Sequence, residues 1–128
     1  MANKDVYNHT VKIDKDGKTW LYDEGVEMEK PGGPVGYLLI GLLTCMGLTA
    51  QAILGKMKID YEKVVMNGLL YMVDEKIRYG NRIKCTLSLE GAPELDEETK
   101  ARIAQISKKY CTVSVTIERN PEITLSME

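Results

Sequence analysis

The stretch Gly32–Gln51, GGPVGYLLIGLLTCMGLTAQ, decides how the rest of the chain must be arranged. It lies within a longer segment, from Pro31 to Gly55, that contains no charged residue. Pro34 suits the first turn of a helix, where its missing N–H costs no hydrogen bond, and Gly55 is a typical stop signal. The sequence therefore predicts a helix from Pro34 to about Ile53 that is apolar nearly all round.

Such a segment could be a membrane span, a phosphate-binding glycine loop or a buried core helix. Twenty residues from Val35 to Leu54 would form a helix of ~30 Å, which is enough to cross a bilayer. A spanning helix, however, would leave the apolar faces of the neighbouring strands uncovered. The glycines lack the GxGxxG spacing and a following Lys-Ser/Thr pair, which argues against a phosphate loop. We therefore interpret the segment as a central core helix and expect no membrane partner.

Alternating apolar residues predict strands on both sides of this helix. Before it, Val6–Asp14 alternates, and a turn at residues 14–17 leads to Thr19–Tyr22, as in a hairpin. After it, two long strands are predicted over residues 64–73 and 83–90, with a turn around Tyr79-Gly80-Asn81. These strands need a helix against which their apolar faces can pack.

The last third of the chain predicts a helix and then a strand. Asp96 is the expected N-cap of the helix, because Glu97 and Glu98 follow it and complement the positive helix end. The predicted buried stripe of this helix consists of Ile103, Ile106 and Tyr110. The alternation of residues 123–127 predicts a closing strand. The order ββ-α-ββ-α-β defines a single α+β domain over residues 1–128 with a largely antiparallel sheet.

Composition narrows the possible functions. The 128 residues are 44% hydrophobic and 28% charged with a formal net charge of −2, which gives no general attraction to nucleic acid. Three cysteines without framework spacing, and an N-terminus without an apolar run, argue against a secreted disulfide protein. One histidine and no CxxC exclude a His-rich or paired-cysteine metal site. We expect a cytoplasmic protein without cofactor or metal.

The cysteines fall into two groups. Cys85 lies on the apolar face of a predicted strand and is expected to be a small core residue. His9 shares the apolar side of its own strand and is expected to be packed, with one nitrogen satisfied. Cys45 interrupts the apolar helix, and Cys111 directly follows the second helix after two lysines. Cys45 and Cys111 are therefore the candidates for chemistry.

In this arrangement the sequence resembles the OsmC/Ohr family. A Pro-led apolar helix carries Cys45, and Thr49 follows four residues later. Two long strands and a second helix come next, and that helix ends in the Tyr-Cys-x-Val-Ser segment of residues 110–114. An alternating strand closes the chain. The similarity extends from about Pro34 to the end and, more loosely, to the first hairpin.

The resemblance implies an OsmC-like intertwined homodimer, with antiparallel sheets from both chains wrapped around two central helices. It also implies a stress-response peroxidase that reduces organic hydroperoxides. Cys45 would be the peroxidatic thiolate and Cys111 the resolving cysteine. An external dithiol would then reduce the disulfide that they form.

Two features depart from the family pattern. Val35 occupies the place after the proline where active members carry a carboxylate, and no arginine precedes Arg78, although the family supplies one from an N-terminal segment. An unperturbed cysteine is only ~3% thiolate at pH 7, so losing both groups predicts a weakened peroxidase. The alternative is a non-enzymatic OsmC-like dimer that binds a small hydrophobic ligand in its apolar cleft or senses redox state.

Overall fold

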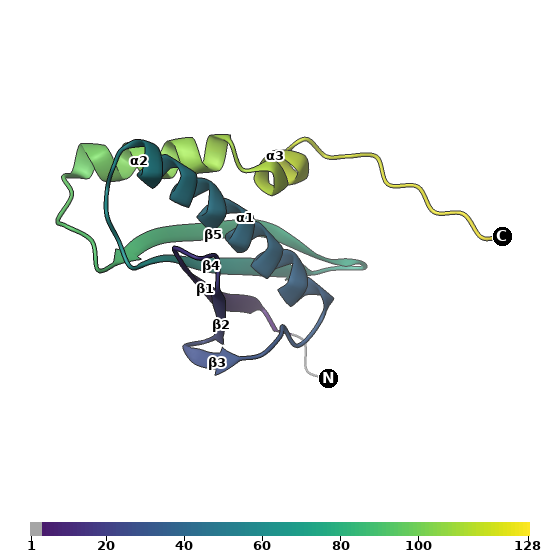
Figure 1. Ribbon diagram of the computed structural model, residues 1–128. Coiled ribbons are helices and arrows are strands. Elements are labelled where there is room, and N and C mark those ends of the chain that lie inside the picture. Colours follow the sequence, from purple (N-terminus) through teal and green to yellow (C-terminus); the bar gives the residue numbers. More distant parts are fainter. Residues whose placement is uncertain (1–3) are drawn as a thin grey trace.

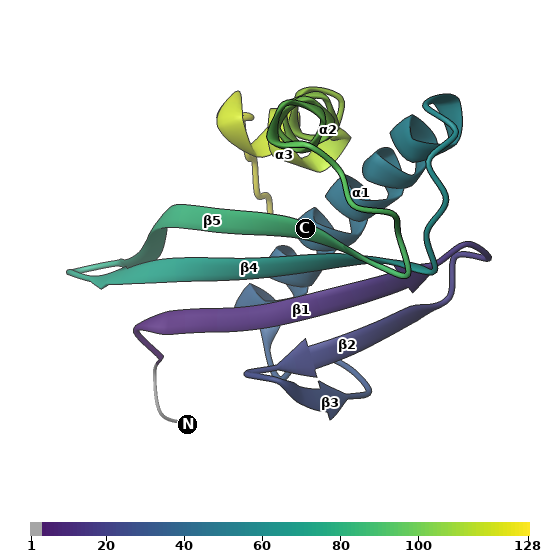
Figure 2. The same cartoon turned by 90° about the vertical axis from the view of Figure 1, so that its left-hand side faces the viewer.

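In the computed structural model, which describes residues 4–128, one long helix packs on one face of a five-stranded antiparallel sheet, and two shorter helices pack against that helix (Figures 1 and 2). The strands are β1 (Val6–Asp14), β2 (Thr19–Asp23), β3 (Val26–Met28), β4 (Lys63–Asp74) and β5 (Arg78–Glu90). The helices are α1 (Pro34–Lys56), α2 (Glu97–Lys109) and α3 (Thr112–Glu118). The predicted α+β class is confirmed, and the strands lie in the order β3-β2-β1-β4-β5.

β1 and β4 form the centre of the sheet and carry the main buried face. Val11 pairs with Met66, and Ile13 pairs with Val64, in the antiparallel register. All four side chains are almost fully buried. Alternate residues of the two strands therefore point at the helices, as their sequence alternation predicted.

The turn between β4 and β5 lies at residues 75–77, so the predicted turn at Tyr79-Gly80-Asn81 is wrong. Gly80 instead belongs to β5, where a Cβ atom would lie 2.6 Å from Leu70 Cδ1. The β4–β5 register also shifts between Tyr71 and Met72. A glycine inside a strand often marks such an irregularity, and here it resembles a turn signal in the sequence.

α1 is the core helix that the sequence predicted. It is long and apolar enough to cross a membrane, yet Leu39, Leu43 and Leu54 are fully buried against the sheet and the other helices. Gly47 allows the closest approach, because a Cβ at this position would lie 2.7 Å from Ile13 Cδ1.

α2 begins as predicted, because the Asp96 side chain accepts a hydrogen bond of 2.8 Å from the Thr99 N–H. Its buried stripe differs from the prediction. Ile103 and Ser107 are buried, whereas Tyr110 is 65% exposed. The helix ends at Lys109, and Tyr110 lies in the turn before α3. Helical spacing therefore does not place Tyr110 on the buried side of α2.

The closing strand predicted at residues 123–127 does not form within this chain. A turn at Arg119 and Asn120 follows α3, and residues 121–128 belong to no helix or strand. Ile123, Leu125 and Met127 are 89%, 97% and 99% exposed. An alternating segment forms a strand only where a sheet edge accepts its backbone hydrogen bonds, and this segment does not pair with an edge of the sheet.

Candidate functional site

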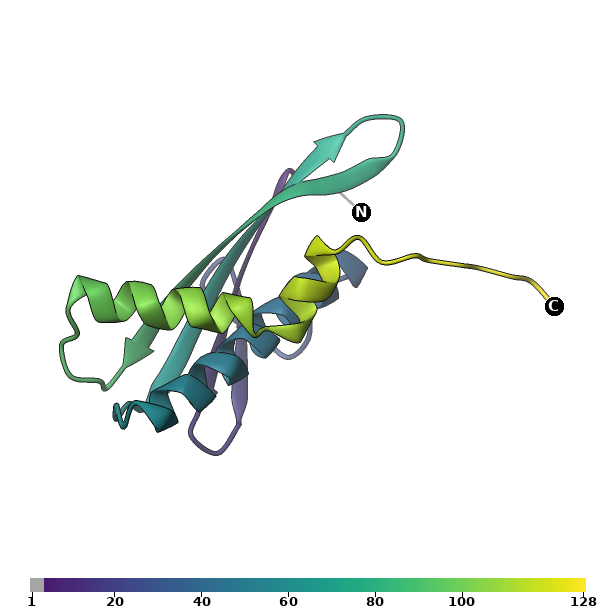
Figure 3. The ribbon, with the colours of Figure 1, turned by 90° about the horizontal axis from the view of Figure 1, so that it is seen from above.

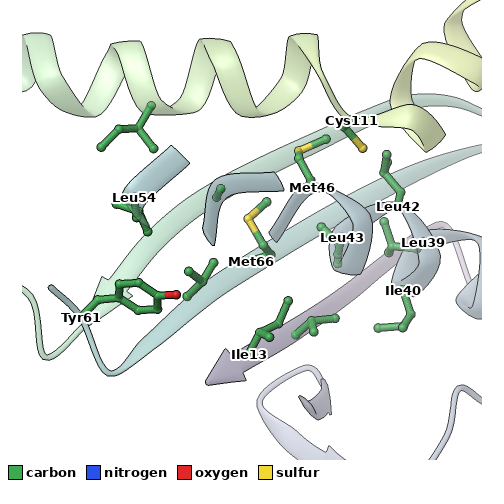
Figure 4. Packing of buried hydrophobic residues seen from close by; sticks show 14 of the residues in the cluster. Ile13, Leu39, Ile40, Leu42, Leu43, Met46, Leu54, Tyr61, Met66 and Cys111 are labelled. Carbon is green, nitrogen blue, oxygen red and sulfur yellow. The ribbon is translucent and has the colours of Figure 1, made fainter. Parts of the chain in front are cut away.

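Cys45 and Cys111 meet where α3 crosses α1. Their side chains are neighbours that influence each other electrostatically, and both are free cysteines. Cys111 is fully buried, whereas Cys45 is half-buried. Figure 4 shows Cys111 pointing from the start of α3 toward α1, beside Leu42 and Met46. The fold therefore brings together the two residues that the sequence singled out.

The break between α2 and α3 aims the Cys111 side chain inward. Cys111 has extended backbone angles (φ −76°, ψ 111°) and is the N-cap of α3. Its Sγ accepts a hydrogen bond of 3.4 Å from the Ser114 N–H. Cysteine thus takes the place that serine, aspartate or asparagine usually occupies at a helix start. One sulfur therefore caps a helix and faces a second thiol.

The surroundings of Cys111 favour its neutral form. Burial raises the pKa of the Cys111 thiol, and the Ser114 N–H partly offsets this effect. The adjacent Cys45 raises the pKa further. Cys111 is therefore a thiol at neutral pH.

A polar chain that the sequence did not reveal runs from Cys111 to the surface. The Ser114 hydroxyl, which is almost fully buried, donates to Glu118 Oε1 at 3.0 Å. Lys108 forms an ion pair of 2.8 Å with the same carboxylate. The Ser-x-x-x-Glu spacing is the only sequence signal for this contact, and it has meaning only if α3 is helical.

Within the described residues, no carboxylate replaces the family's acidic group in the first turn of α1, and two arginines contact tyrosine rings. The first turn of α1 contains no acidic residue, and the half-buried Val35 packs against the core. Arg78 lies 6.0 Å from the ring centre of Tyr7, and Arg82 lies 5.5 Å from that of Tyr71. Among the described residues, no cluster of His, Cys, Asp and Glu could hold a metal ion.

His9 is buried as predicted, but its predicted hydrogen bond is not seen at Nδ1. This nitrogen lies 3.5 Å from the Asp23 carboxylate and has no hydrogen-bond partner in the described part of the chain. Burial lowers the pKa of His9 below 6.5, and Asp23 opposes the shift. The ring packs beside Gly36 near the start of α1, where a Cβ would lie 3.1 Å from Nε2.

A groove of about 730 Å³ separates β5 from α2 and α3. Leu42, Met46 and Met66 contribute to its lining, together with Ile83, Cys85 and Leu87 of β5. Cys85 is therefore only half-buried, which corrects its predicted place in the closed core. Burial still raises the pKa of its thiol. Within the described part of the chain no helix packs directly on β5, so the groove is lined both by β5 and by residues of the core.

The geometry defines an α+β protein in which two cysteines face each other. A family model described as OsmC-like protein matches residues 29–126, and the chain belongs to this family. No curated protein sequence matches the chain.

Solved structures share the fold at low sequence identity. An OsmC-like hydroperoxide resistance protein from Jannaschia sp. CCS1 superposes with a TM-score of 0.65 at 13% identity, covering 98% of this chain and 95% of the other. An OsmC-like protein from Mycoplasma pneumoniae has a TM-score of 0.56 at 19% identity, covering 92% and 89%. An OsmC-like protein of unknown function from Vibrio cholerae has a TM-score of 0.55 at 12% identity, covering 84% and 77%.

Proposed function

We propose that the protein is a thiol-dependent peroxidase that reduces organic hydroperoxides at a modest rate. The adjacency of Cys45 and Cys111 carries this proposal, because a two-cysteine mechanism requires a pair that can become a disulfide. The structural similarity to a hydroperoxide resistance protein supports it.

In the proposed reaction the Cys45 thiolate attacks one oxygen of the O–O bond. The bond breaks, Cys45 becomes a sulfenic acid, and the leaving alkoxide takes a proton to become an alcohol. The Cys111 thiol then loses its proton and attacks the sulfenic sulfur. This step forms the disulfide and releases water. An external dithiol restores both thiols by exchange and is itself oxidised.

The surroundings of Cys45 account for the modest rate. Family members hold the thiolate with a carboxylate and an N-terminal arginine, whereas this chain has Val35 in place of the carboxylate and no arginine before Arg78. An adjacent cation lowers a thiol pKa by ~1–3 units. Without the cation, the fraction of reactive thiolate falls about tenfold for each pKa unit of that lowering.

The proposed working form is a cytoplasmic homodimer. Tyr37, Leu38 and Leu48 of α1 are about half exposed, at 55%, 50% and 47%. An apolar stripe along a core helix is a typical surface for a second protein subunit. Free thiols fit a reducing compartment.

The test is mass spectrometry of protein treated with an organic hydroperoxide, without reductant. We expect a Cys45–Cys111 linkage with loss of two hydrogens and one alcohol formed per chain. Cys45→Ser should abolish peroxide consumption, and Cys85→Ser, the matched control, should leave it unchanged. The peroxidase proposal is wrong if no linkage forms and Cys45→Ser consumes peroxide as fast as the unaltered protein.

A second candidate function is the binding of a small hydrophobic ligand by a non-enzymatic dimer. The groove beside β5 favours it, because its lining is largely apolar and it opens to core residues. Native mass spectrometry of the purified protein checks this candidate. A bound small molecule that a Leu87→Asp substitution releases would support it, whereas protein without added mass would count against it.

A further inference from the structure

The direction of the Cys111 side chain depends on the break between α2 and α3. α2 ends at Lys109 and α3 begins at Thr112, so Cys111 belongs to a short connection at which the two helices meet at an angle (Figure 3). The Cys111 N–H donates to the Lys108 carbonyl at 3.3 Å, and the Cys111 carbonyl accepts from the Val115 N–H at 3.0 Å. The backbone of Cys111 is therefore bound to both helices, and their relative position sets where its sulfur points.

An ion pair joins the two helices outside this connection. Lys108 Nζ, in the last turn of α2, lies 2.8 Å from Oε1 of Glu118, the last residue of α3. It is the only ion pair between α2 and α3 among the described residues. The pair therefore spans the bend in which Cys111 lies.

The same carboxylate is connected to the sulfur of Cys111 through one buried residue. Glu118 Oε1 accepts a hydrogen bond of 3.0 Å from the Ser114 hydroxyl, and the Ser114 N–H donates to Cys111 Sγ at 3.4 Å. Ser114 is 5% exposed, so its hydroxyl needs a protein partner. Lys108 and the Ser114 hydroxyl hold the pKa of Glu118 below its usual value, so the carboxylate is charged at neutral pH. We call Lys108, Glu118 and Ser114 the polar bridge.

α3 is too short to keep this arrangement by itself. It has seven residues, most of them β-branched, and an isolated helix of this length is not stable in water. Ser114 is buried near its start, whereas residues 116–118 at its end are exposed. The contact with Lys108 is therefore the polar contact that fastens the exposed end of α3 to α2.

We propose that the polar bridge holds Cys111 in position to form a disulfide with Cys45. Its three members are positioning residues, since they act through Cys111. The inference rests on the proposed peroxidase and assigns residues to its second step alone. The first step, in which the Cys45 thiolate attacks the hydroperoxide, does not involve the polar bridge.

The position of Cys111 decides between two fates of the Cys45 sulfenic acid. In the productive step the two sulfurs bond, the S–O bond of the sulfenic acid breaks, and the hydroxyl group leaves as water with the proton of the Cys111 thiol. This step requires Cβ atoms ~3.5–4.5 Å apart. When Cys111 is displaced, a second hydroperoxide instead transfers one oxygen atom to the sulfenic acid, which gives a sulfinic acid and an alcohol.

The first measurement uses glutathione in place of peroxide, so it tests the positioning without the peroxidase reaction. In a Cys85→Ser background, Cys45 and Cys111 are the only cysteines. The equilibrium constant for their oxidation by oxidised glutathione reports how well the two thiols are placed for a disulfide. Urea denaturation checks that each reduced variant is folded.

The variants change one charge at a time. Lys108→Glu replaces the ion pair with two like charges, and Lys108→Met removes the attraction alone. Lys109→Glu is the matched control, because it makes the same charge change one residue away, where the described residues contain no ion pair. Lys108→Glu/Glu118→Lys restores the pair with reversed charges, and the Ser114 oxygen can accept from the introduced ammonium group.

We expect Lys108→Glu to lower the equilibrium constant about fivefold or more, because an exposed ion pair is worth up to about that factor and like charges oppose it. Lys108→Met should lower it less, and the double variant should recover most of the loss. Lys109→Glu should leave it within about twofold, since it breaks no pair. An unchanged constant in Lys108→Glu, an equal loss in Lys109→Glu, or no recovery in the double variant would each overturn the proposal.

Titration with an organic hydroperoxide then tests the consequence for the second step. Lys108→Glu should accumulate sulfinic acid at about fivefold lower hydroperoxide concentration than Lys109→Glu, while both form the first sulfenic acid at the same rate. Equal sensitivity of the two variants would overturn the assignment to this step. If the unaltered protein forms no disulfide with hydroperoxide, the peroxidase and the second-step role fall together, whereas an unchanged glutathione equilibrium refutes the positioning alone.

Discussion

Cys111 combines two roles in one side chain, since its sulfur caps α3 and faces Cys45. Serine can accept the same hydrogen bond but cannot form a disulfide. Substitution at this residue therefore separates its part in the fold from its part in the chemistry.

We expect Cys111→Ser to keep the fold, to lose the disulfide and to accumulate the Cys45 sulfenic acid after one equivalent of hydroperoxide. Cys111→Ala should lose the cap as well and be less stable than the serine variant by roughly 0.5–2 kcal/mol. A sulfenic-acid trapping reagent with mass spectrometry measures the first effect, and urea denaturation measures the second. Equal stability of the two variants would contradict the capping role.

His9 should make the stability of the protein depend on pH. Its pKa is lowered by burial in the folded state, so the unfolded chain takes up the proton first as the pH falls. The contribution of neutral His9 to the free energy of unfolding is complete above about pH 6.5 and is lost as the pH falls below that value. We expect the melting temperature to fall between pH 7.5 and pH 5.5, with a smaller fall in His9→Gln. Equal slopes in the two proteins would show that other groups govern this range.

At the scale of elements, the packing of α1 on the sheet depends on Gly47. A Cβ there would lie 2.7 Å from Ile13 Cδ1 and 3.2 Å from Met66 Cγ. Gly47→Ala should therefore cost about 1–3 kcal/mol of stability through overpacking, despite the better helix propensity of alanine. Gly55→Ala is the matched control, because nothing lies within 4 Å of its Cβ position and it should stabilise by up to ~1 kcal/mol. Chemical denaturation measures both, and a stabilising Gly47→Ala would contradict the close contact.

Elements whose local pattern agrees with their packing were predictable from sequence. The strand Val6–Asp14, the core helix and the Asp96 cap belong to this group. α3 was not predicted, because its sequence TVSVTIE is rich in β-branched residues that favour strands. Its N-cap at Cys111 and its packing on α1 support the helix instead.

For the candidate site, the sequence predicted the two cysteines but not the contacts that depend on the packing of the helices. Cys45 and Cys111 stood out because Cys45 interrupts the apolar helix and Cys111 directly follows the second helix. The Ser114–Glu118–Lys108 contacts were not predicted, because they exist only if α3 is helical. The alternative function assumed an apolar cleft, but its place was not predicted, since it depends on how far α2 and α3 lie from β5.

At the scale of the whole molecule, the thiol pair and the proposed dimer contact are separable. Cys45 and Cys111 come from one chain, and the exposed stripe consists of other residues of α1, namely Tyr37, Leu38 and Leu48. A substitution in the stripe should therefore change the oligomeric state without dismantling the site.

We expect Leu48→Glu to convert the dimer to a monomer, raising its dissociation constant at least about a hundredfold, because an unpaired charge is costly to bury. Ala101→Glu, on the exposed side of α2, is the matched control and should remain dimeric. Light scattering across a concentration series measures both. The Leu48→Glu monomer should still form the Cys45–Cys111 disulfide when treated with hydroperoxide. Linkage in the dimer alone would mean that the second copy completes the site around Cys45.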